Sequence, residues 1–155
     1  MNRTVESDVP NSVAILTDHT KAPKIVLEGP LSGLTHQTIL GASLGSLHAS
    51  LWQHHMTEPL VVPAHFHEVE ETVVVLSGCL RFVVGPNIDD WDGKSDPLEN
   101  ALITDCGPDA TFQVPARTLH GYQITGVPAR VLIFMPDATA KTSLPDGSAM
   151  QLPWV

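Results

Sequence analysis

The sequence predicts an all-β fold of antiparallel strands, and three stretches carry most of that prediction. Residues Thr72–Leu76 form a valine-rich, β-branched run of the kind found in strands buried on both faces. Cys79–Val84 alternates, which places Phe82 on one face and Arg81 on the other. Ala129–Met135 is an apolar run typical of a strand in a sandwich core.

The part of the chain before these stretches offers shorter strand candidates. Val13–Leu16 could form an edge strand or an arm, and Lys24–Glu28 is a better candidate because proline and glycine bound it. Residues 31–46 show neither a helical nor a strand period. Leu47–Gln53 is predicted to be the first long strand, with Trp52 as a large apolar anchor.

Two histidines and a carboxylate stand directly before the valine-rich run. Alternate side chains of a strand share a face, so we expect His65 and His67 on one side. The three residues between His67 and Glu71 allow a tight turn that returns the carboxylate to the imidazoles. Imidazole and carboxylate together suit a first-row divalent metal. Glu68 and Glu70 are expected to be solvated, and they are the alternatives if the turn differs by one residue.

The Ser77-Gly78 step is predicted to be a turn, so that Thr72–Leu76 and Cys79–Val84 pair as a hairpin. Pro86–Asn100 follows as an inserted acidic loop. Its aspartates do not keep the ligand spacing of a calcium loop, so we expect it to be solvated.

The remaining metal ligand is expected farther along the chain. A short run over Ala110–Val114 ends at Pro115, and a four-residue turn leads into Leu119–Gln123. This stretch carries His120, the only histidine after residue 67. The alternative is that His65 and His67 are two surface histidines without a metal. That alternative does not explain the spacing of Glu71, Gly78, Pro115 and His120.

These residues resemble the two sequence motifs of the cupins. The first motif, H-x-H-x3-E-x6-G, is matched at every fixed position by His65, His67, Glu71 and Gly78. The second requires a proline five residues before a histidine, as Pro115 and His120 provide.

Four positions depart from the motifs. Pro59 replaces the glycine that opens the first motif, and seven residues separate Gly107 from Pro115 where the second motif has five. Arg117 replaces an inner glycine and Ile124 replaces an asparagine. The resemblance covers residues 47–135 and is specific for a fold, not for a reaction.

The resemblance implies a double-stranded β-helix, or jelly-roll barrel, that holds one divalent metal through His65, His67, Glu71 and His120. It places the barrel core at residues 47–135, after an N-terminal arm with edge strands at 1–46 and before a C-terminal tail at 136–155. Iron is the expected metal, and manganese, nickel or zinc are alternatives.

The resemblance also implies a class of function. We expect a metalloenzyme that acts on a small organic substrate chelated to the metal, with dioxygenase-like chemistry. The alternatives are a Lewis-acid isomerase or decarboxylase, and a non-catalytic binding or sensor module. Small cupins commonly pair, so a homodimer is expected.

Composition and length narrow the possible number of domains, the possible partners and the expected location of the protein. A chain of 155 residues with 43% hydrophobic side chains fits one domain over residues 1–155. A net charge of −9 argues against a nucleic-acid partner. No apolar run could span a membrane, and Met1–Asp8 lacks the apolar stretch of a signal peptide, which predicts a cytoplasmic protein. Cys79 and Cys106 are expected to be reduced.

Three further positions could contribute to the site. Tyr122 lies two residues after His120 on the same strand face, and it could act as an acid or hydrogen-bond donor or simply pack. Arg117 could clamp a substrate carboxylate, or be solvated, or pair with an acid of a second subunit. The pair His54-His55 could reach the barrel mouth, but a loop position is the prediction.

Overall fold

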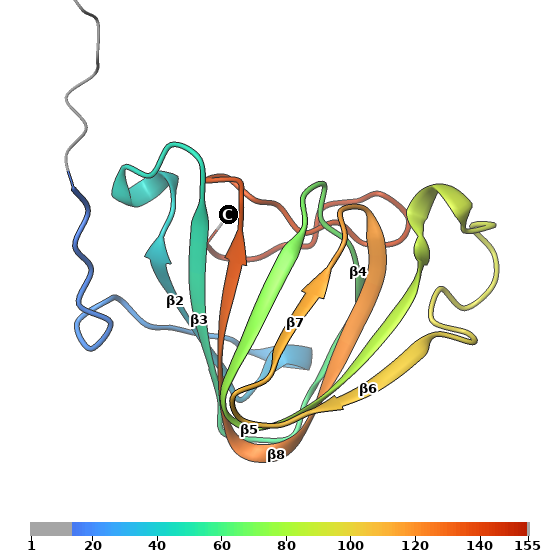
Figure 1. Ribbon diagram of the computed structural model, residues 1–155, viewed down its shortest axis with the longest axis horizontal. Coiled ribbons are helices and arrows are strands. Elements are labelled where there is room, and N and C mark those ends of the chain that lie inside the picture. The colour runs from blue at the N-terminus through green and yellow to red at the C-terminus, as the bar shows by residue number, and fades with distance from the viewer. Residues whose placement is uncertain (1–13, 155) are drawn as a thin grey trace, which may run out of the picture.

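The computed structural model describes residues 14–154 and confirms the predicted all-β fold (Figure 1). Eight strands pair antiparallel in the order β1-β2-β3-β8-β5-β6, with β4 on β8 and β7 on β5. The strands are β1 (Ile25–Val26), β2 (Leu34–Leu40), β3 (Ser50–Met56), β4 (Val61–His65), β5 (Glu71–Asn87), β6 (Leu102–Cys106), β7 (Thr111–Val114) and β8 (Thr118–Met135). Short 3₁₀ helices are η1 (Gly29–Leu31), η2 (Ala42–Leu44) and η3 (Ile88–Asp90).

The two long strands, β5 and β8, give the sheet its jelly-roll shape because each bends and contributes to both walls. In one wall Val73 pairs with Ile133, and in the other Val83 pairs with Gly121. The strands β3 and β7 extend the first wall, and β4 and β6 extend the second. Figure 1 shows the walls diverging from the bends of β5 and β8 toward an open upper end.

The predicted hairpin between Thr72–Leu76 and Cys79–Val84 is wrong, because both stretches belong to β5 and both pair with β8. Gly78 lies at the bend with a φ of 76°. A Cβ there would come within 2.5 Å of the carbonyl oxygen of Gly126, so the close crossing of the two strands requires a glycine. The predicted strands at 119–123 and 129–135 are likewise two parts of β8.

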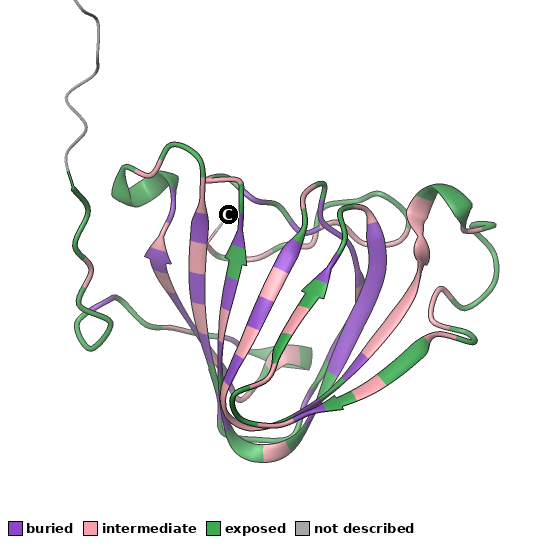
Figure 2. Ribbon diagram, in the orientation of Figure 1, coloured by how far each residue is buried: buried purple, intermediate pink, exposed green. Residues whose placement is uncertain are grey.

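The core lies between the walls and follows the alternation of the strands. Val73 and Val75 face inward, whereas Val74 and Leu76 are only half-buried, so the valine-rich run is not buried on both faces. Figure 2 shows this alternation along the first half of β5. In the second half, Phe82 is fully buried.

The N-terminal elements differ from the prediction in extent. Residues 31–46 contain β2, and β3 starts and ends three residues later than Leu47–Gln53. Only Ile25–Val26 of the predicted strand Lys24–Glu28 is a strand. Val13 lies outside the described residues, and residues 14–16 form no strand.

The C-terminal segment, residues 136–154, crosses the open end of the two walls (Figure 1). An isolated bridge between Phe66 and Ser143 attaches it beside β4. Both cysteines are free, with Cys106 buried and Cys79 exposed. Within residues 14–154 we find no helix long and apolar enough to cross a bilayer.

Candidate metal centre

Four side chains, three from strands and one from the turn after β4, meet between the walls. His65 ends β4, His67 follows it, Glu71 begins β5, and His120 lies near the start of β8, where it pairs with His65. All four are at least 96% buried, and one potential ligand atom from each lies within 4.8 Å of the others. The structure therefore brings together all the residues that the sequence predicted as metal ligands.

Backbone carbonyls orient each imidazole of the site. The Nδ1 atoms of His65, His67 and His120 lie 2.7, 2.8 and 2.8 Å from the carbonyl oxygens of Pro63, Lys141 and Thr118. A carbonyl only accepts hydrogen bonds, so each Nδ1–H donates, and in the neutral ring Nε2 keeps its lone pair. This is the arrangement that prepares a histidine to bind a metal through Nε2.

The atoms that face the centre fit a metal ion. Among the described residues, Nε2 of His120 and Oε1 of Glu71 are buried without a hydrogen-bond partner. Nε2 of His67 lies 2.9 Å from Oε2 of Glu71, and Nε2 of His120 lies 3.6 Å from Oε1. Ligands about 2.1 Å from a divalent metal lie roughly 3 Å apart when adjacent, so these spacings suit one ion.

The imidazoles differ in how firmly they hold a proton. Burial lowers the pKa of His65 to about 3, and the neighbouring His120 and His67 add to the effect. Burial also lowers the pKa of His67, but the hydrogen bond and charge of Glu71 outweigh it and leave a net rise. Burial raises the pKa of Glu71, and its contacts with His120 and His67 overcome this and hold it well below its usual range. His67 and Glu71 thus form a buried ion pair that a metal would replace.

An apolar pocket adjoins the centre and is lined by three of the four side chains, His65, His67 and Glu71. Its cavity of about 40 Å³ has room for a few waters or for the polar end of a small ligand. The C-terminal segment closes one side with Met150, Leu152 and Trp154. Leu31, Leu34, Trp52, His54, Val62, Tyr122, Ile133 and Thr142 complete the wall.

Tyr122 lines this pocket, as the alternation of β8 predicted, and only 5% of its surface is exposed. Burial and the charge of Glu71 raise the pKa of its phenol. The hydroxyl therefore keeps its proton at neutral pH and can serve as a donor.

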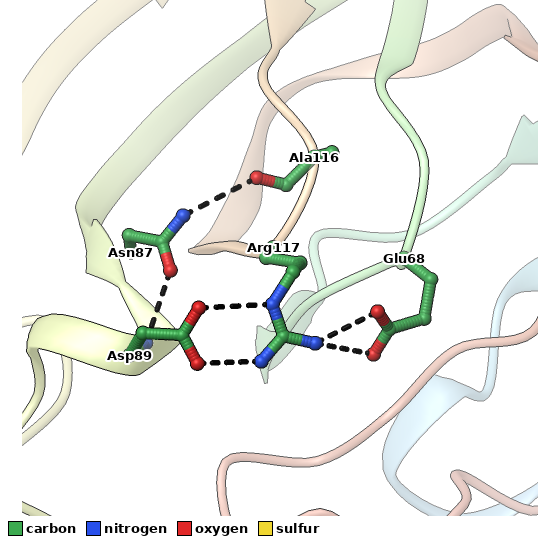
Figure 3. Close-up of polar contacts among 5 residues, drawn as sticks. All are labelled: Glu68, Asn87, Asp89, Ala116 and Arg117. Atoms are coloured by element: carbon green, nitrogen blue, oxygen red, sulfur yellow. Dashed lines mark hydrogen bonds and ion pairs between the residues drawn. The ribbon is translucent and has the colours of Figure 1, made fainter.

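Arg117 lies outside the pocket, and its guanidinium pairs within its own chain (Figure 3). It contacts Glu68 at 2.7 Å and Asp89 at 2.6 Å, so the predicted substrate clamp and pairing with a second subunit are not what the structure shows. Its φ of 60° explains why the motif has a glycine at this position. Its backbone N–H donates to the carbonyl oxygen of His67 at 2.7 Å, which ties the turn to the metal centre.

The prediction for His54 and His55 was wrong, because both lie in β3 rather than in a loop. His54 points inward beside Trp52 and lines the pocket, whereas His55 is exposed. Extending the predicted strand past Gln53 would have placed His54 on the face of Trp52 by simple alternation. No local pattern could have found Trp154, which reaches the pocket from the far end of the chain.

Solved structures with similar folds identify the architecture. The polyketide cyclase RemF from Streptomyces resistomycificus has a TM-score of 0.60 and 22% identity, over 80% of each chain. KdgF from Halomonas sp. has a TM-score of 0.61 and 13% identity, over 82% of this chain and 97% of the other. A Bacillus subtilis oxalate decarboxylase, OxdC, has a TM-score of 0.64 and 14% identity. This chain has the cupin fold.

The similarity to these cupins extends to the fold alone. The match to OxdC covers 91% of this chain but 33% of the decarboxylase, so the chain spans about a third of that protein. No family model matches the sequence, and no curated protein matches it.

Proposed function

We propose that this cupin binds one divalent transition metal through His65, His67, Glu71 and His120, and acts on a small organic substrate. The observation that supports this most is the set of buried, unpartnered ligand atoms at the centre. Buried polar atoms are costly to leave unpaired, so their convergence on one point favours a bound cation.

The bound metal would polarise an oxygen of the substrate or activate dioxygen beside it. His65, His67, Glu71 and His120 would supply four ligands, and a metal that takes six ligands would have positions left for an oxygen of the substrate. The apolar wall would exclude bulk water from the substrate. Tyr122 would donate a hydrogen bond or a proton from its hydroxyl to an oxygen of the substrate.

Two reaction classes are candidates. The first is iron-dependent oxygenation of a chelated catechol, thiol or diketone, which the cupin motifs suggested. The second is Lewis-acid isomerisation or decarboxylation, supported by the similarity to a polyketide cyclase and to oxalate decarboxylases, one of which was studied for its Mn(II) centres. Manganese, nickel or zinc would serve the second class.

The test starts with elemental analysis of protein purified without added metal. Iron- and manganese-loaded protein is then screened for oxygen consumption with catechols, thiols and diketones, and for CO₂ release from small carboxylic acids. His120→Ala is the inactive control. Absence of a bound metal would overturn the proposal, and a bound metal without turnover would favour a binding or sensor module.

The role of Tyr122 has its own test. We expect Tyr122→Phe to keep the metal content of the parent and to lower turnover roughly 10²-fold, which is the usual size of one acid–base contribution. Unchanged turnover in this variant would assign Tyr122 to packing.

A further inference from the structure

A second pair of buried histidines lies in the wall beside the metal centre. His36 of β2 and His54 of β3 are register partners, and their side chains are 0% and 5% exposed. Neither belongs to the proposed metal ligands. Two imidazoles buried side by side in an apolar core call for a physical reason, because each buried polar group needs a partner.

Hydrogen bonds connect this pair into a chain. Oγ1 of Thr38 lies 2.9 Å from Nε2 of His36, and Nδ1 of His36 lies 3.0 Å from Nε2 of His54. The last atom, Nδ1 of His54, is buried and has no partner among the described residues. His54 lines the metal pocket, whereas His36 does not. Nε2 of His54 already bonds His36, so Nδ1 of His54 is the ring nitrogen that is left for a ligand in the pocket.

The opposite end of the chain lies at a different hollow. Thr38 is half-buried and lines a cavity of about 200 Å³ together with the exposed residues Ser43 and Thr139. Trp154 lines both hollows, and its ring stacks on His36 at a centroid distance of 3.7 Å. The hydrogen-bonded chain thus runs beside Trp154, from a residue that lines one hollow to a residue that lines the other.

Both imidazoles are neutral at physiological pH. Burial lowers the pKa of His36 to about 3, with a contribution from His54. Burial lowers the pKa of His54 to about 4, against a smaller upward effect of Glu71. A neutral imidazole carries one proton, so the shared hydrogen bond allows only two arrangements.

In the first arrangement both rings carry the proton on Nδ1. Thr38 then donates to His36, His36 donates to His54, and Nδ1–H of His54 is a free donor. In the second arrangement both rings carry it on Nε2, every bond of the chain is reversed, and Nδ1 of His54 is a free acceptor. Neither arrangement creates a charge.

We propose that Thr38, His36 and His54 form a neutral proton relay that ends in the metal pocket and serves an oxygen of the bound substrate. When Nδ1–H of His54 gives its proton to that oxygen, Nε2 of His54 takes the proton of His36, and Nε2 of His36 takes the proton of Thr38. The Thr38 oxygen regains a proton from water in the outer hollow, and the hydroxide that remains is released to solvent, so the atoms and charges balance. This relay rests on the proposed function, because it requires a substrate in the pocket.

The matched protonation of the two rings can be tested first without any metal. Long-range ¹H–¹⁵N NMR spectra of metal-free protein with ¹⁵N-labelled histidine identify which nitrogen carries each proton. We expect His36 and His54 to be neutral and to have the same tautomer. A charged ring or opposite tautomers would overturn the relay, whatever the outcome for the metal.

Zinc-loaded protein with oxalate as the probe tests the connection to the pocket. Oxalate only accepts hydrogen bonds, so with oxalate bound both rings should carry their proton on Nδ1. We expect His54→Phe to keep the zinc content and to weaken oxalate binding about tenfold, as for one hydrogen bond to a charged group. In the same variant the tautomer of His36 should be identical with and without oxalate, because His36 is connected to the pocket only through His54.

His55→Phe is the matched control, because His55 is the exposed neighbour on the same strand. It should change neither zinc content nor oxalate affinity. A His54→Phe protein that binds oxalate as the parent does, or a parent in which the two rings do not carry Nδ1–H with oxalate bound, would overturn the relay alone. A parent that binds no zinc would contradict the proposed metal centre instead.

Discussion

At the scale of single residues, the three imidazoles of the centre share one hydrogen-bond pattern but differ in their contact with Glu71. All three donate from Nδ1 to a backbone carbonyl. Only His67 also contacts Glu71 closely enough to hold a second proton in the absence of metal. Burial lowers the pKa of His65 to about 3, so this ring is ready to bind a metal without first losing a proton.

The first prediction concerns the four ligands. We expect alanine at His65, His67 or His120 to lower metal affinity by more than the 10- to 100-fold that loss of an outer hydrogen-bond partner costs. Glu71→Gln should cost less, since it keeps an oxygen donor and loses only the charge. Elemental analysis after dialysis measures the effect, with the exposed His55 changed to alanine as control. Parent-like metal content in all four variants would show that the site is misassigned.

The second prediction concerns pH and metal removal. The proton that a metal must displace is held by His67, whose pKa is raised above 6.5. In metal-free protein the His67–Glu71 pair stabilises the fold fully between pH 4.5 and 6.5, the ordinary pKa values of glutamate and histidine. Above pH 6.5 the contribution of His67 decreases, and it is lost as the pH rises through the raised pKa of His67. Metal binding instead strengthens as that proton leaves.

The difference in melting temperature between metal-loaded and chelated protein should therefore grow as the pH rises through 6.5 and shrink below it. Thermal melts at pH 5.5 and 8 with and without chelator measure this difference. A difference that is equal at both values, or larger at the lower one, would contradict the prediction.

At the scale of elements, the long strands β5 and β8 position the site. One part of β8 carries His120 into the wall with β4, and the other part pairs with the β3 strand that carries His54. The bend at Gly78 lets β5 continue from the wall that starts at Glu71 into the opposite wall.

The third prediction tests this bend. Gly78→Ala would place a Cβ 2.5 Å from the carbonyl oxygen of Gly126, at a φ of 76° that alanine adopts poorly. We expect it to lower the free energy of unfolding by about 3 kcal/mol, measured by urea denaturation. Gly107→Ala is the control, because no atom lies within 4 Å of its added Cβ. Equal stability of the two variants would mean that the crossing of β5 and β8 tolerates a side chain.

At the scale of the whole molecule, the outer face of one wall remains apolar. Leu51, Val74, Leu132 and Phe134 lie next to one another across β3, β8 and β5, and the Phe134 side chain is 41% exposed. The segment at 19–22 covers the neighbouring part of this face, where the side chain of Gln37 donates to the carbonyl oxygens of His19 and Ala22.

The fourth prediction is that this apolar face joins two copies of the chain. A homodimer with a two-fold axis would bury the face on both copies at once. Light scattering at micromolar concentration should give twice 16.7 kDa for the parent. Phe134→Lys should give a monomer, and Ile103→Lys, at the exposed edge strand β6, should not. A monomeric parent would contradict the prediction.

The sequence by itself determined the features that depend on local periodicity. The spacing of His65, His67 and Glu71 follows the two-residue repeat of a strand and one tight turn, so their convergence could be predicted, and the second motif added His120. The alternation likewise predicted that Phe82 and Arg81 lie on opposite faces and that Tyr122 shares the face of His120, and the structure buries Phe82, Tyr122 and His120.

Only the tertiary structure decided which distant segments meet. Gly78 resembles a hairpin turn locally, but the pairing of both flanking stretches with β8 makes it a bend in one strand. Trp154 stacks on His36 although 117 residues separate them, and Arg117 pairs with Glu68 of the turn after β4 and with Asp89 of η3. Such contacts arise from how the walls close over a shared core, which no periodicity within a short stretch of sequence records.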